Sequence, residues 1–368
     1  MKIKAAVAHG AGEELSLEEL ELEDPRDDEI LVKVVATGVC HTDLVVMAGH
    51  LPTPMPAVLG HEGAGVVEKV GAAVTKVKPG DHVVMTFNSC GSCPSCADDE
   101  PAYCYEFFPR NFFATRPDES VALSKGAEKI HSNFFGQSSF ATHALCHSVN
   151  VVKVPEDAQL DLLGPLACGI QTGAGAVMNA LKVAAGKSFV VFGAGSVGLS
   201  AVMAAKAKGA ATIIAVDLND ARLEVARELG ATHSVNAAAE GVVGTIRAAG
   251  GFGVDYALDT TGLPPVIRQA VDALAPRGTC AVLGAPMPES QICVDNTDFM
   301  SSGKKLIGVV EGASQPDRFI PELIALWQAG DFPFDRLVTF YPFDEINRAI
   351  EDSHKGIAIK PIVRIGQG

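Results

Sequence analysis

Four cysteines lie close together and have the spacing of a metal site. Cys90, Cys93 and Cys96 follow one another at intervals of three residues, and Cys104 comes eight residues after Cys96. Four thiolates can complete the tetrahedral coordination of Zn²⁺, and such a complete set leaves no position open for substrate. The spacing therefore predicts a structural zinc site, in which the metal orders a segment rich in turn residues and acids.

A glycine pattern further along the chain is typical of dinucleotide binding. Gly193, Gly195 and Gly198 follow the apolar run 188–192 and begin a helical stretch. These glycines permit a tight turn, a close approach of the backbone to a pyrophosphate, and close packing of helix on strand. The N-terminus of the helix then offers its unpaired N–H groups to the phosphates.

An acidic residue predicts which dinucleotide binds. Asp217 lies 19 residues after Gly198, at the end of the next predicted strand. A carboxylate there accepts hydrogen bonds from the adenosine ribose and repels a 2′-phosphate, which favours NAD over NADP. Arg222 is a candidate for a further ribose contact, and is equally compatible with a solvated charge on a helix.

Two other segments carry residue types that bind metals or move protons. The first contains Cys40, His41, Thr42 and Asp43, and the second is Gly60-His61-Glu62. Their spacing alone does not define a site, because a single His or Cys is more often a core or surface residue.

Composition limits the partners. The chain has 368 residues with 29 Lys and Arg against 44 Asp and Glu, a net charge of −15. This length suggests two domains, and the acidic balance disfavours binding to nucleic acid. Nine cysteines in such a length are too few for a disulfide scaffold, so their clustering favours metal or catalytic roles.

No membrane or secretory segment is expected. Two long uncharged stretches, 188–205 and 162–181, are interrupted by glycines and a proline, and a membrane-spanning helix needs about 20 mostly apolar residues. The N-terminus has no apolar signal-peptide core or cleavage site. We expect a cytoplasmic protein without a membrane partner.

Hydrophobic patterns predict an α/β protein. Residues 1–150 are strand-like and rich in Gly and Pro, as in a barrel-like β-fold. After about residue 170, apolar runs alternate with helical segments, which predicts a doubly wound parallel sheet. The expected strands are 188–192, 212–216, 254–258, 279–283 and 306–310. The expected helices are 198–208, 219–229, 264–274, 318–328 and 343–352, followed by a last strand at 360–365.

These motifs together resemble one family. Gly60-His61-Glu62 followed by Gly65, Gly71 and Val74 is similar to the signature of zinc-containing medium-chain alcohol dehydrogenases. The cysteine cluster, the segment 164–173 and the glycine motif follow in the family's order, so the resemblance covers essentially the whole chain. The stretches 136–142 and 341–347 resemble the aryl (benzyl) alcohol dehydrogenase branch.

The resemblance implies a GroES-like catalytic domain at 1–169, a Rossmann NAD-binding domain at 170–312, and a return to the catalytic domain at 313–368. The catalytic zinc would lie in the cleft between the domains. It also implies a homodimer or homotetramer, with the strand 306–310 as a pairing edge. A homologous enzyme would act on a small alcohol or aldehyde.

The resemblance further implies a catalytic zinc held by Cys40, His61 and Cys168, with one position open for water or substrate. Glu62 would act beside the metal or as a transient ligand, and Asp43 would orient His61 by accepting its other N–H. The bound ion would stabilise an alkoxide that releases hydride to the nicotinamide.

The resemblance also implies roles for residues that stand at the family's proton-transfer and cofactor positions. Thr42 would take the proton of the alcohol. The place of a later proton-relay histidine holds Val45, so the proton needs another route, through the cofactor ribose and water or through His41. We instead assign His41, together with Lys360, to the pyrophosphate, and place Thr172 near the nicotinamide.

The resemblance predicts a substrate pocket lined by Leu51, Phe87 and Phe140, and this apolar lining suits a benzyl or allylic primary alcohol. The alternatives are a terpenoid alcohol such as geraniol, a short aliphatic alcohol or S-(hydroxymethyl)glutathione. A zinc-free enoyl or quinone reductase is disfavoured by the cysteine sets. A non-catalytic NAD-binding protein is disfavoured by the intact ligand positions.

Overall fold

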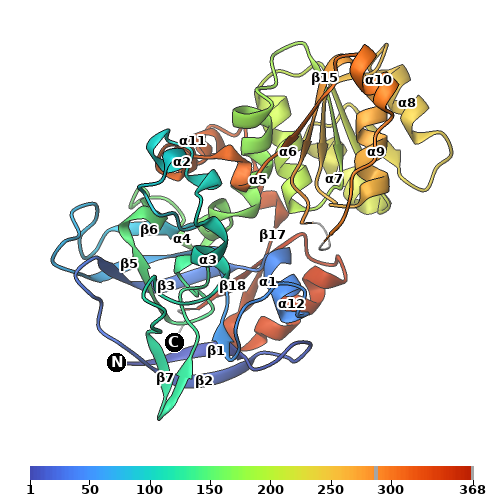
Figure 1. Cartoon of the computed structure of the whole chain (residues 1–368). Coiled ribbons are helices and arrows are strands. Elements are labelled where there is room, and N and C mark those ends of the chain that lie inside the picture. The colour runs from blue at the N-terminus through green and yellow to red at the C-terminus, as the bar shows by residue number, and fades with distance from the viewer. Residues whose placement is uncertain (286–288, 366–368) are drawn as a thin grey trace. The chain divides into compact units, whose positions relative to one another are not determined.

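The computed structural model describes residues 1–285 and 289–365, which form two compact units (Figure 1). Unit 1 comprises Met1–Gly169, Gln315–Glu322 and the chain from Asp335 onward. Unit 2 comprises Ile170–Ser314 and Leu323–Phe334. The expected fold class is confirmed, because unit 1 is β-rich with a curled sheet and unit 2 contains a parallel sheet with helices.

Unit 1 is built from two sheets. The five-stranded sheet has the order β4-β1-β2-β7-β8, and the seven-stranded sheet has the order β10-β6-β5-β3-β18-β17 with β9 paired to β3. The strands are β1 (Lys2–Ala8), β2 (Ser16–Leu22), β3 (Glu29–Gly38), β4 (Ala57–Val58), β5 (Gly63–Val70), β6 (His82–Met85), β7 (Leu123–Lys125), β8 (Glu128–Ile130), β9 (His143–His147), β10 (Val151–Lys153), β17 (Val338–Pro342) and β18 (Lys360–Arg364).

The central strand β3 organises unit 1. It pairs antiparallel with β5, β9 and β18, and eight of its ten residues are buried. Val and Ile dominate such strands because branched side chains pack well on a pleated surface. Because β18 belongs to the end of the chain, the sheet joins segments that are distant in sequence.

Short helices connect the strands of unit 1. They are α1 (His41–Met47), α2 (Pro94–Ala97), α3 (Phe107–Phe112), α4 (Leu160–Leu163) and α12 (Ile346–His354). Helix α11 (Pro316–Gln328) is divided between the two units. The expected helix at 343–352 instead begins as one 3₁₀ turn, Phe343–Glu345, and continues as α12.

Unit 2 contains a six-stranded parallel sheet of order β13-β12-β11-β14-β15-β16. Its strands are β11 (Ser188–Phe192), β12 (Thr212–Asp217), β13 (His233–Asn236), β14 (Val254–Asp259), β15 (Leu274–Val282) and β16 (Lys305–Gly308). Its helices are α5 (Gly169–Gly175), α6 (Ser196–Ala207), α7 (Asp220–Leu229), α8 (Val242–Ala249), α9 (Pro264–Asp272) and α10 (Asn296–Ser301).

The predicted elements of unit 2 are present with shifted ends. Strand β11 is buried along its whole length and pairs with β12 and β14, as a run of apolar residues in a parallel sheet requires. Helix α7 begins after Asn219, whose side chain accepts hydrogen bonds from the N–H groups of Ala221 and Arg222, and it stops at Gly230 with φ +131°.

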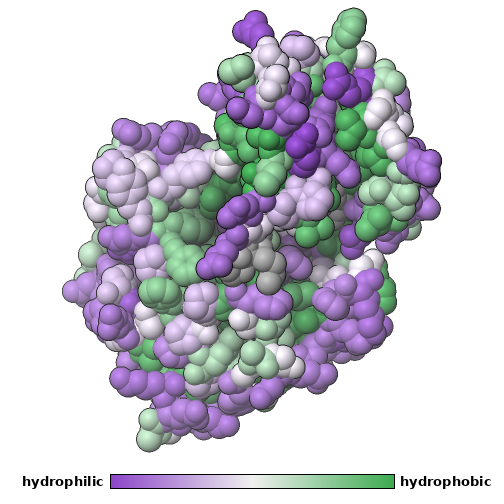
Figure 2. Space-filling view, turned by 45° about the vertical axis from the view of Figure 1, so that its right-hand side comes forward, coloured by the Kyte–Doolittle hydropathy of each residue, from purple (hydrophilic) through white to green (hydrophobic). Residues whose placement is uncertain are grey.

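Among the described residues, none of the helices combines the length and apolar character needed to cross a bilayer. Hydrophilic residues cover much of the face shown in Figure 2, between smaller hydrophobic areas.

Candidate active site and metal centres

The first turn of α1 fixes Cys40. Strand β3 ends at Gly38, and Cys40 precedes α1 in an extended conformation. The backbone N–H of Cys40 donates to Oδ2 of Asp43 at 3.0 Å. Thr42 is half-buried, with Oγ1 3.9 Å from the Cys40 sulfur, while His41 is exposed. The start of this short helix therefore presents a thiol and a hydroxyl side by side.

Three predicted ligands meet inside unit 1. Ligand atoms of Cys40, His61 and Cys168 all lie within 4.8 Å of one another, and the three residues are buried. The sulfurs of Cys40 and Cys168 are 3.9 Å apart, and the hydrogen bond from the Cys168 thiol is the main cause that lowers the pKa of Cys40. These residues come from the end of β3, the segment before β5 and the segment before α5.

The histidine of this group is held on one side and open on the other. Nδ1 of His61 is 3.0 Å from Oδ1 of Asp43, whereas Nε2 is buried and has no hydrogen-bond partner among the described residues. An unpaired buried ring nitrogen costs free energy unless a ligand binds it. Two sulfurs and one such nitrogen are suitable donors for zinc, so the residues present fit that metal.

A buried ion pair involves Glu62, the residue that follows His61 in the chain. The ammonium group of Lys360 donates to both carboxylate oxygens of Glu62, at 2.8 and 2.9 Å, and to the carbonyl of Val39 at 3.2 Å. Burial raises the pKa of Glu62. Burial also opposes charge on Lys360, but the Glu62 carboxylate outweighs it and keeps the pKa of Lys360 raised.

Lys360 and Glu62 therefore have partners that their predicted roles did not include. The three Lys360 acceptors are protein groups, and the predicted pyrophosphate contact stays a prediction. Oε1 of Glu62 also accepts from the N–H of Gly169 at 3.1 Å. Glu62 is not part of the group of metal-ligand atoms found among the described residues.

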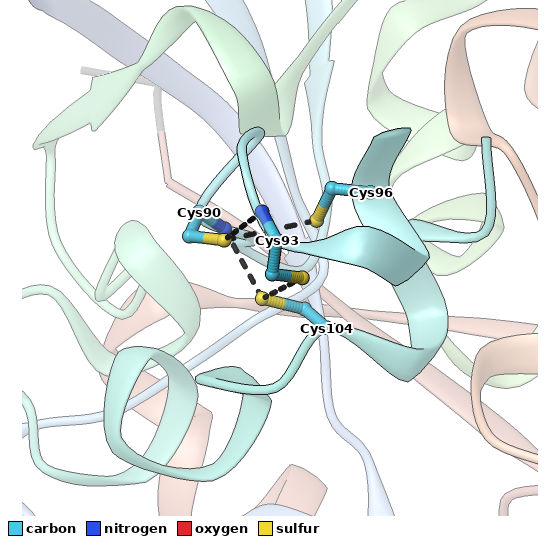
Figure 3. A group of neighbouring side chains, drawn as sticks. All are labelled: Cys90, Cys93, Cys96 and Cys104. Carbon is cyan, nitrogen blue, oxygen red and sulfur yellow. Dashed lines mark hydrogen bonds between the residues drawn. The ribbon is translucent and has the colours of Figure 1, made fainter. Parts of the chain in front are cut away.

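The four-cysteine cluster also lies in unit 1. Ligand atoms of Cys90, Cys93, Cys96 and Cys104 lie within 4.8 Å of one another, and Figure 3 shows their sulfurs pointing toward a common centre. Hydrogen bonds led by the Ser92 N–H lower the pKa of Cys90 to about 6, while burial raises the pKa of Cys104 to about 12. Four convergent sulfurs form a closed tetrahedral donor set that fits zinc.

The glycine loop in unit 2 has the geometry that phosphate binding needs. Gly193 adopts φ +95°, which only glycine adopts readily, and a Cβ at Gly198 would lie 1.8 Å from the Gly193 carbonyl oxygen. Gly195 precedes α6 and has no atom within 4 Å of a would-be Cβ. The backbone at Gly195 therefore has open space beside it, which the predicted phosphate contact requires.

Three other predicted cofactor residues lie in unit 2, and one of them contacts this loop. The carboxylate of Asp217 accepts from the N–H of Ala194 at 2.6 Å and from that of Asn219 at 2.8 Å. Nε of Arg222 is buried and has no hydrogen-bond partner among the described residues. Oγ1 of Thr172 donates to Glu311 at 3.3 Å. Asp217 is thus fixed against the loop that would bind the phosphates.

The predicted substrate pocket has mixed support. Leu51 is half-buried and Phe87 is 3% exposed, but Phe140 is 0% exposed. A Cβ at Gly60 would lie 2.4 Å from the Phe140 ring, so this ring packs on the backbone beside His61. All three assignments stay predictions, and Phe140 has no exposed surface to offer a substrate.

Sequence reasoning missed the aromatic rings that contact the metal-site histidine. The ring of Phe135 stacks on His61 with centroids 4.5 Å apart, and Phe134 meets it edge-on at 5.6 Å. Phe107 links Phe135, at 6.4 Å, to Phe87, at 5.8 Å. The only signal in the sequence is the pair Phe134-Phe135 just before the 136–142 stretch, and no periodicity connects it to His61.

Comparisons with known proteins agree with this fold. The alcohol dehydrogenase GroES-like domain family matches residues 26–156, and the zinc-binding dehydrogenase family matches residues 196–328. Geraniol dehydrogenase of Castellaniella defragrans is 47% identical over 362 residues, covering 98% of this chain and 97% of that protein.

Two solved structures cover the whole chain. Benzyl alcohol dehydrogenase from Acinetobacter calcoaceticus is 51% identical with a TM-score of 0.97, and both chains are covered completely. An alcohol dehydrogenase zinc-binding domain protein from Burkholderia ambifaria is 53% identical with a TM-score of 0.98 and the same coverage.

The chain belongs to the zinc-containing medium-chain alcohol dehydrogenases. It is an alcohol dehydrogenase that uses zinc and a nicotinamide cofactor, and its substrate is a small alcohol.

Proposed function

We propose that this enzyme oxidises aromatic, benzyl-type primary alcohols to aldehydes with NAD, in a reversible hydride transfer. The observation that carries the proposal is the aromatic group formed by Phe87, Phe107 and Phe135 beside His61. Aromatic rings favour other rings through edge-to-face and offset contacts, and an apolar lining suits a substrate with one polar group. The benzyl alcohol dehydrogenase of similar sequence supports this choice.

The chain's own residues define how the reaction would be prepared. Cys40, His61 and Cys168 would hold the catalytic zinc, and Asp43 accepts the Nδ1–H of His61 so that the Nε2 lone pair faces the two sulfurs. When bound, zinc lowers the pKa of the alcohol hydroxyl, and the nicotinamide accepts the hydride. Thr42 would receive the hydroxyl proton at Oγ1.

The route of that proton beyond Thr42 is constrained by the sequence. Val45, on the same helix, has no group that can carry a proton. The proton would therefore leave through the cofactor ribose and water. The exposed His41 is then free to contact the pyrophosphate.

The preference for NAD rests on Asp217. Its carboxylate is held by two backbone N–H groups at the end of β12, beside the glycine loop. A negative charge fixed there favours ribose hydroxyls and opposes a 2′-phosphate.

A second candidate substrate class is terpenoid allylic alcohols, favoured by the 47% identity to geraniol dehydrogenase. Geraniol, like benzyl alcohol, carries its hydroxyl next to an unsaturated carbon, and the same apolar lining would accept both. A panel of kcat/KM values for benzyl alcohol, geraniol, ethanol and S-(hydroxymethyl)glutathione separates the classes. We expect benzyl alcohol to rank first, and a higher value for geraniol would replace the aromatic assignment with the terpenoid one.

A variant tests the role of the rings directly. Phe107→Leu should lower kcat/KM for benzyl alcohol about fivefold relative to ethanol, because it removes an aromatic contact and keeps the apolar volume. Phe332→Leu, which changes a buried ring in unit 2, is the control and should leave this ratio unchanged. An unchanged ratio in Phe107→Leu would remove Phe107 from the pocket.

A further inference from the structure

We propose that residues 133–140, called here the 133–140 turn, hold His61 in the orientation that its metal requires, with Gln137 as the main positioning residue. The inference rests on the proposed zinc site of Cys40, His61 and Cys168. It concerns a residue to which neither the glycine and cysteine motifs nor the family resemblance gave a role.

The side-chain amide of Gln137 is bound on both of its ends to the segment that carries the histidine. Its oxygen accepts from the N–H of Gly63 at 3.0 Å, and its nitrogen donates to the carbonyl of His61 at 3.0 Å. The same nitrogen lies 2.9 Å from the carbonyl of Met85, at the end of the neighbouring strand β6. Gln137 is 1% exposed, so water does not compete for these bonds.

Other residues of the 133–140 turn bind the backbone just before His61. Oγ of Ser138 donates to the carbonyl of Val58 at 2.6 Å. The backbone N–H groups of Phe140 and Ser139 donate to the carbonyls of Leu59 and Gly60 at 3.0 and 2.9 Å. With Gln137, the turn therefore binds four consecutive carbonyls, 58 to 61, immediately before and at the histidine.

The backbone of the turn is held in a conformation that it would not adopt alone. Asn133, Phe135 and Ser138 have φ values of +69°, +50° and +53°, in the left-handed region that residues other than glycine rarely occupy. Such residues persist only where surrounding contacts determine them, and they concentrate at functional sites. The contacts to residues 58–63 are among those that hold this turn, together with the hydrogen bond from the Asn150 amide to the Gly136 carbonyl at 2.9 Å.

These contacts leave His61 one free direction. Its main chain is fixed by Gln137, one ring face is covered by Phe135, and Nδ1 meets Asp43. Nε2 has no hydrogen-bond partner in the described part of the chain, and His61 belongs to the group with the two sulfurs. A ligand placed in advance holds its metal more tightly, and residues that orient a ligand change metal affinity by about 10- to 100-fold.

The release rates of the two zinc ions test this role. The wild-type enzyme and the Gln137→Met variant are mixed with the chromogenic chelator 4-(2-pyridylazo)resorcinol, and zinc release is followed over time. Cys40→Ser identifies the phase that belongs to the catalytic site. We expect Gln137→Met to release that ion about tenfold faster. The ion of the four-cysteine cluster should leave at the wild-type rate.

A matched control distinguishes positioning of His61 from a general loss of packing in unit 1. Asn111 is another fully buried amide in unit 1, with three hydrogen bonds to Asn88 and Phe107 and none to residues 58–63. Asn111→Leu should leave the catalytic phase unchanged. If it accelerates this phase as much as Gln137→Met does, or if Gln137→Met changes both phases equally or neither, the inference is overturned.

Two further measurements keep the test decisive. Phe135→Leu removes only the stacked ring and should accelerate the catalytic phase about threefold, so an unchanged rate would refute the role of the turn even if Gln137→Met does not fold. If the wild-type protein holds one zinc and Cys40→Ser does not reduce that number, the proposed catalytic zinc site is refuted. This outcome differs from one in which the site binds zinc but Gln137 does not affect its release.

Discussion

Removing one partner of the Glu29–Arg116 ion pair should reverse the pH dependence of stability. Nε and Nη2 of Arg116 donate to the two carboxylate oxygens of Glu29 at 2.6 and 2.9 Å, and the two side chains are 0% and 1% exposed. Burial opposes ionisation of Glu29, but the hydrogen bonds from Arg116 outweigh it and lower the pKa of the carboxyl group. The pair joins the first residue of β3 to the chain before β7.

The Arg116→Met variant leaves this carboxylate buried beside the single N–H of Arg26, at 3.0 Å. Loss of one partner of a buried pair costs about 3–5 kcal/mol. In the wild type the lowered pKa contributes stability above the ordinary pKa of Glu, and this stability is lost as the pH falls through the folded-state value. In the variant, burial dominates and raises the pKa of Glu29. The contribution of Glu29 to stability is then present at low pH and is lost as the pH rises.

The assay is denaturant unfolding of the zinc-loaded full chain, followed by circular dichroism at about pH 5 and about pH 8. We expect the variant to lose more stability, relative to wild type, at the higher pH. The Glu29→Gln/Arg116→Met double variant should recover at least half of the loss, because no unpaired charge remains buried. Glu23 also loses its contact with Arg116, but its side chain is 56% exposed and stays solvated. A loss below about 1 kcal/mol, or the same loss at both pH values, would refute the reasoning.

Three further predictions concern the cofactor and the second metal centre. Asp217→Ala should raise kcat/KM with NADP relative to NAD at least about tenfold, and an unchanged ratio of the two would exclude Asp217 from cofactor choice. His41→Ala should raise the dissociation constant for NAD about fivefold in equilibrium titrations, and no change would remove His41 from the pyrophosphate site. Cys93→Ser should reduce bound zinc by one ion per chain, measured by metal analysis, and lower the thermal midpoint, because a structural zinc site contributes folding free energy. Retention of both ions would contradict this site.

The features that could be predicted from sequence are local ones. Four cysteines within 15 residues can be brought together by local turns alone, and Cys90, Cys93, Cys96 and Cys104 do form one cluster. The strand, glycine turn and helix around Gly193 are likewise consecutive in the chain, so their pattern indicated a parallel α/β unit. The ends of elements were less predictable, because capping contacts and pairing with neighbouring strands determine them.

The aromatic neighbours of the metal site were not predictable in this way. The family resemblance predicts Phe140 at the substrate, and this stays a prediction; in the structure its ring packs against Gly60, while Phe135 stacks on His61. Phe135 and Phe140 are both buried, but one ring stacks on the imidazole of His61 and the other packs on the backbone at Gly60. Residue type alone does not reveal which of these contacts each ring makes, and Phe135 and Ser138 also adopt left-handed backbone conformations that the sequence does not announce.

By itself the sequence determined the chemistry that is available: which residues can bind a metal, which loop can accept phosphates, and which class of fold surrounds them. Only the tertiary structure decided which of these residues meet. Lys360 contacts Glu62 across 298 residues, and Cys40 lies beside Cys168 across 128 residues. The physical reason is that sheet pairing, such as that of β18 with β3, brings distant segments together through contacts spread over the whole unit, and no short stretch of sequence contains that information.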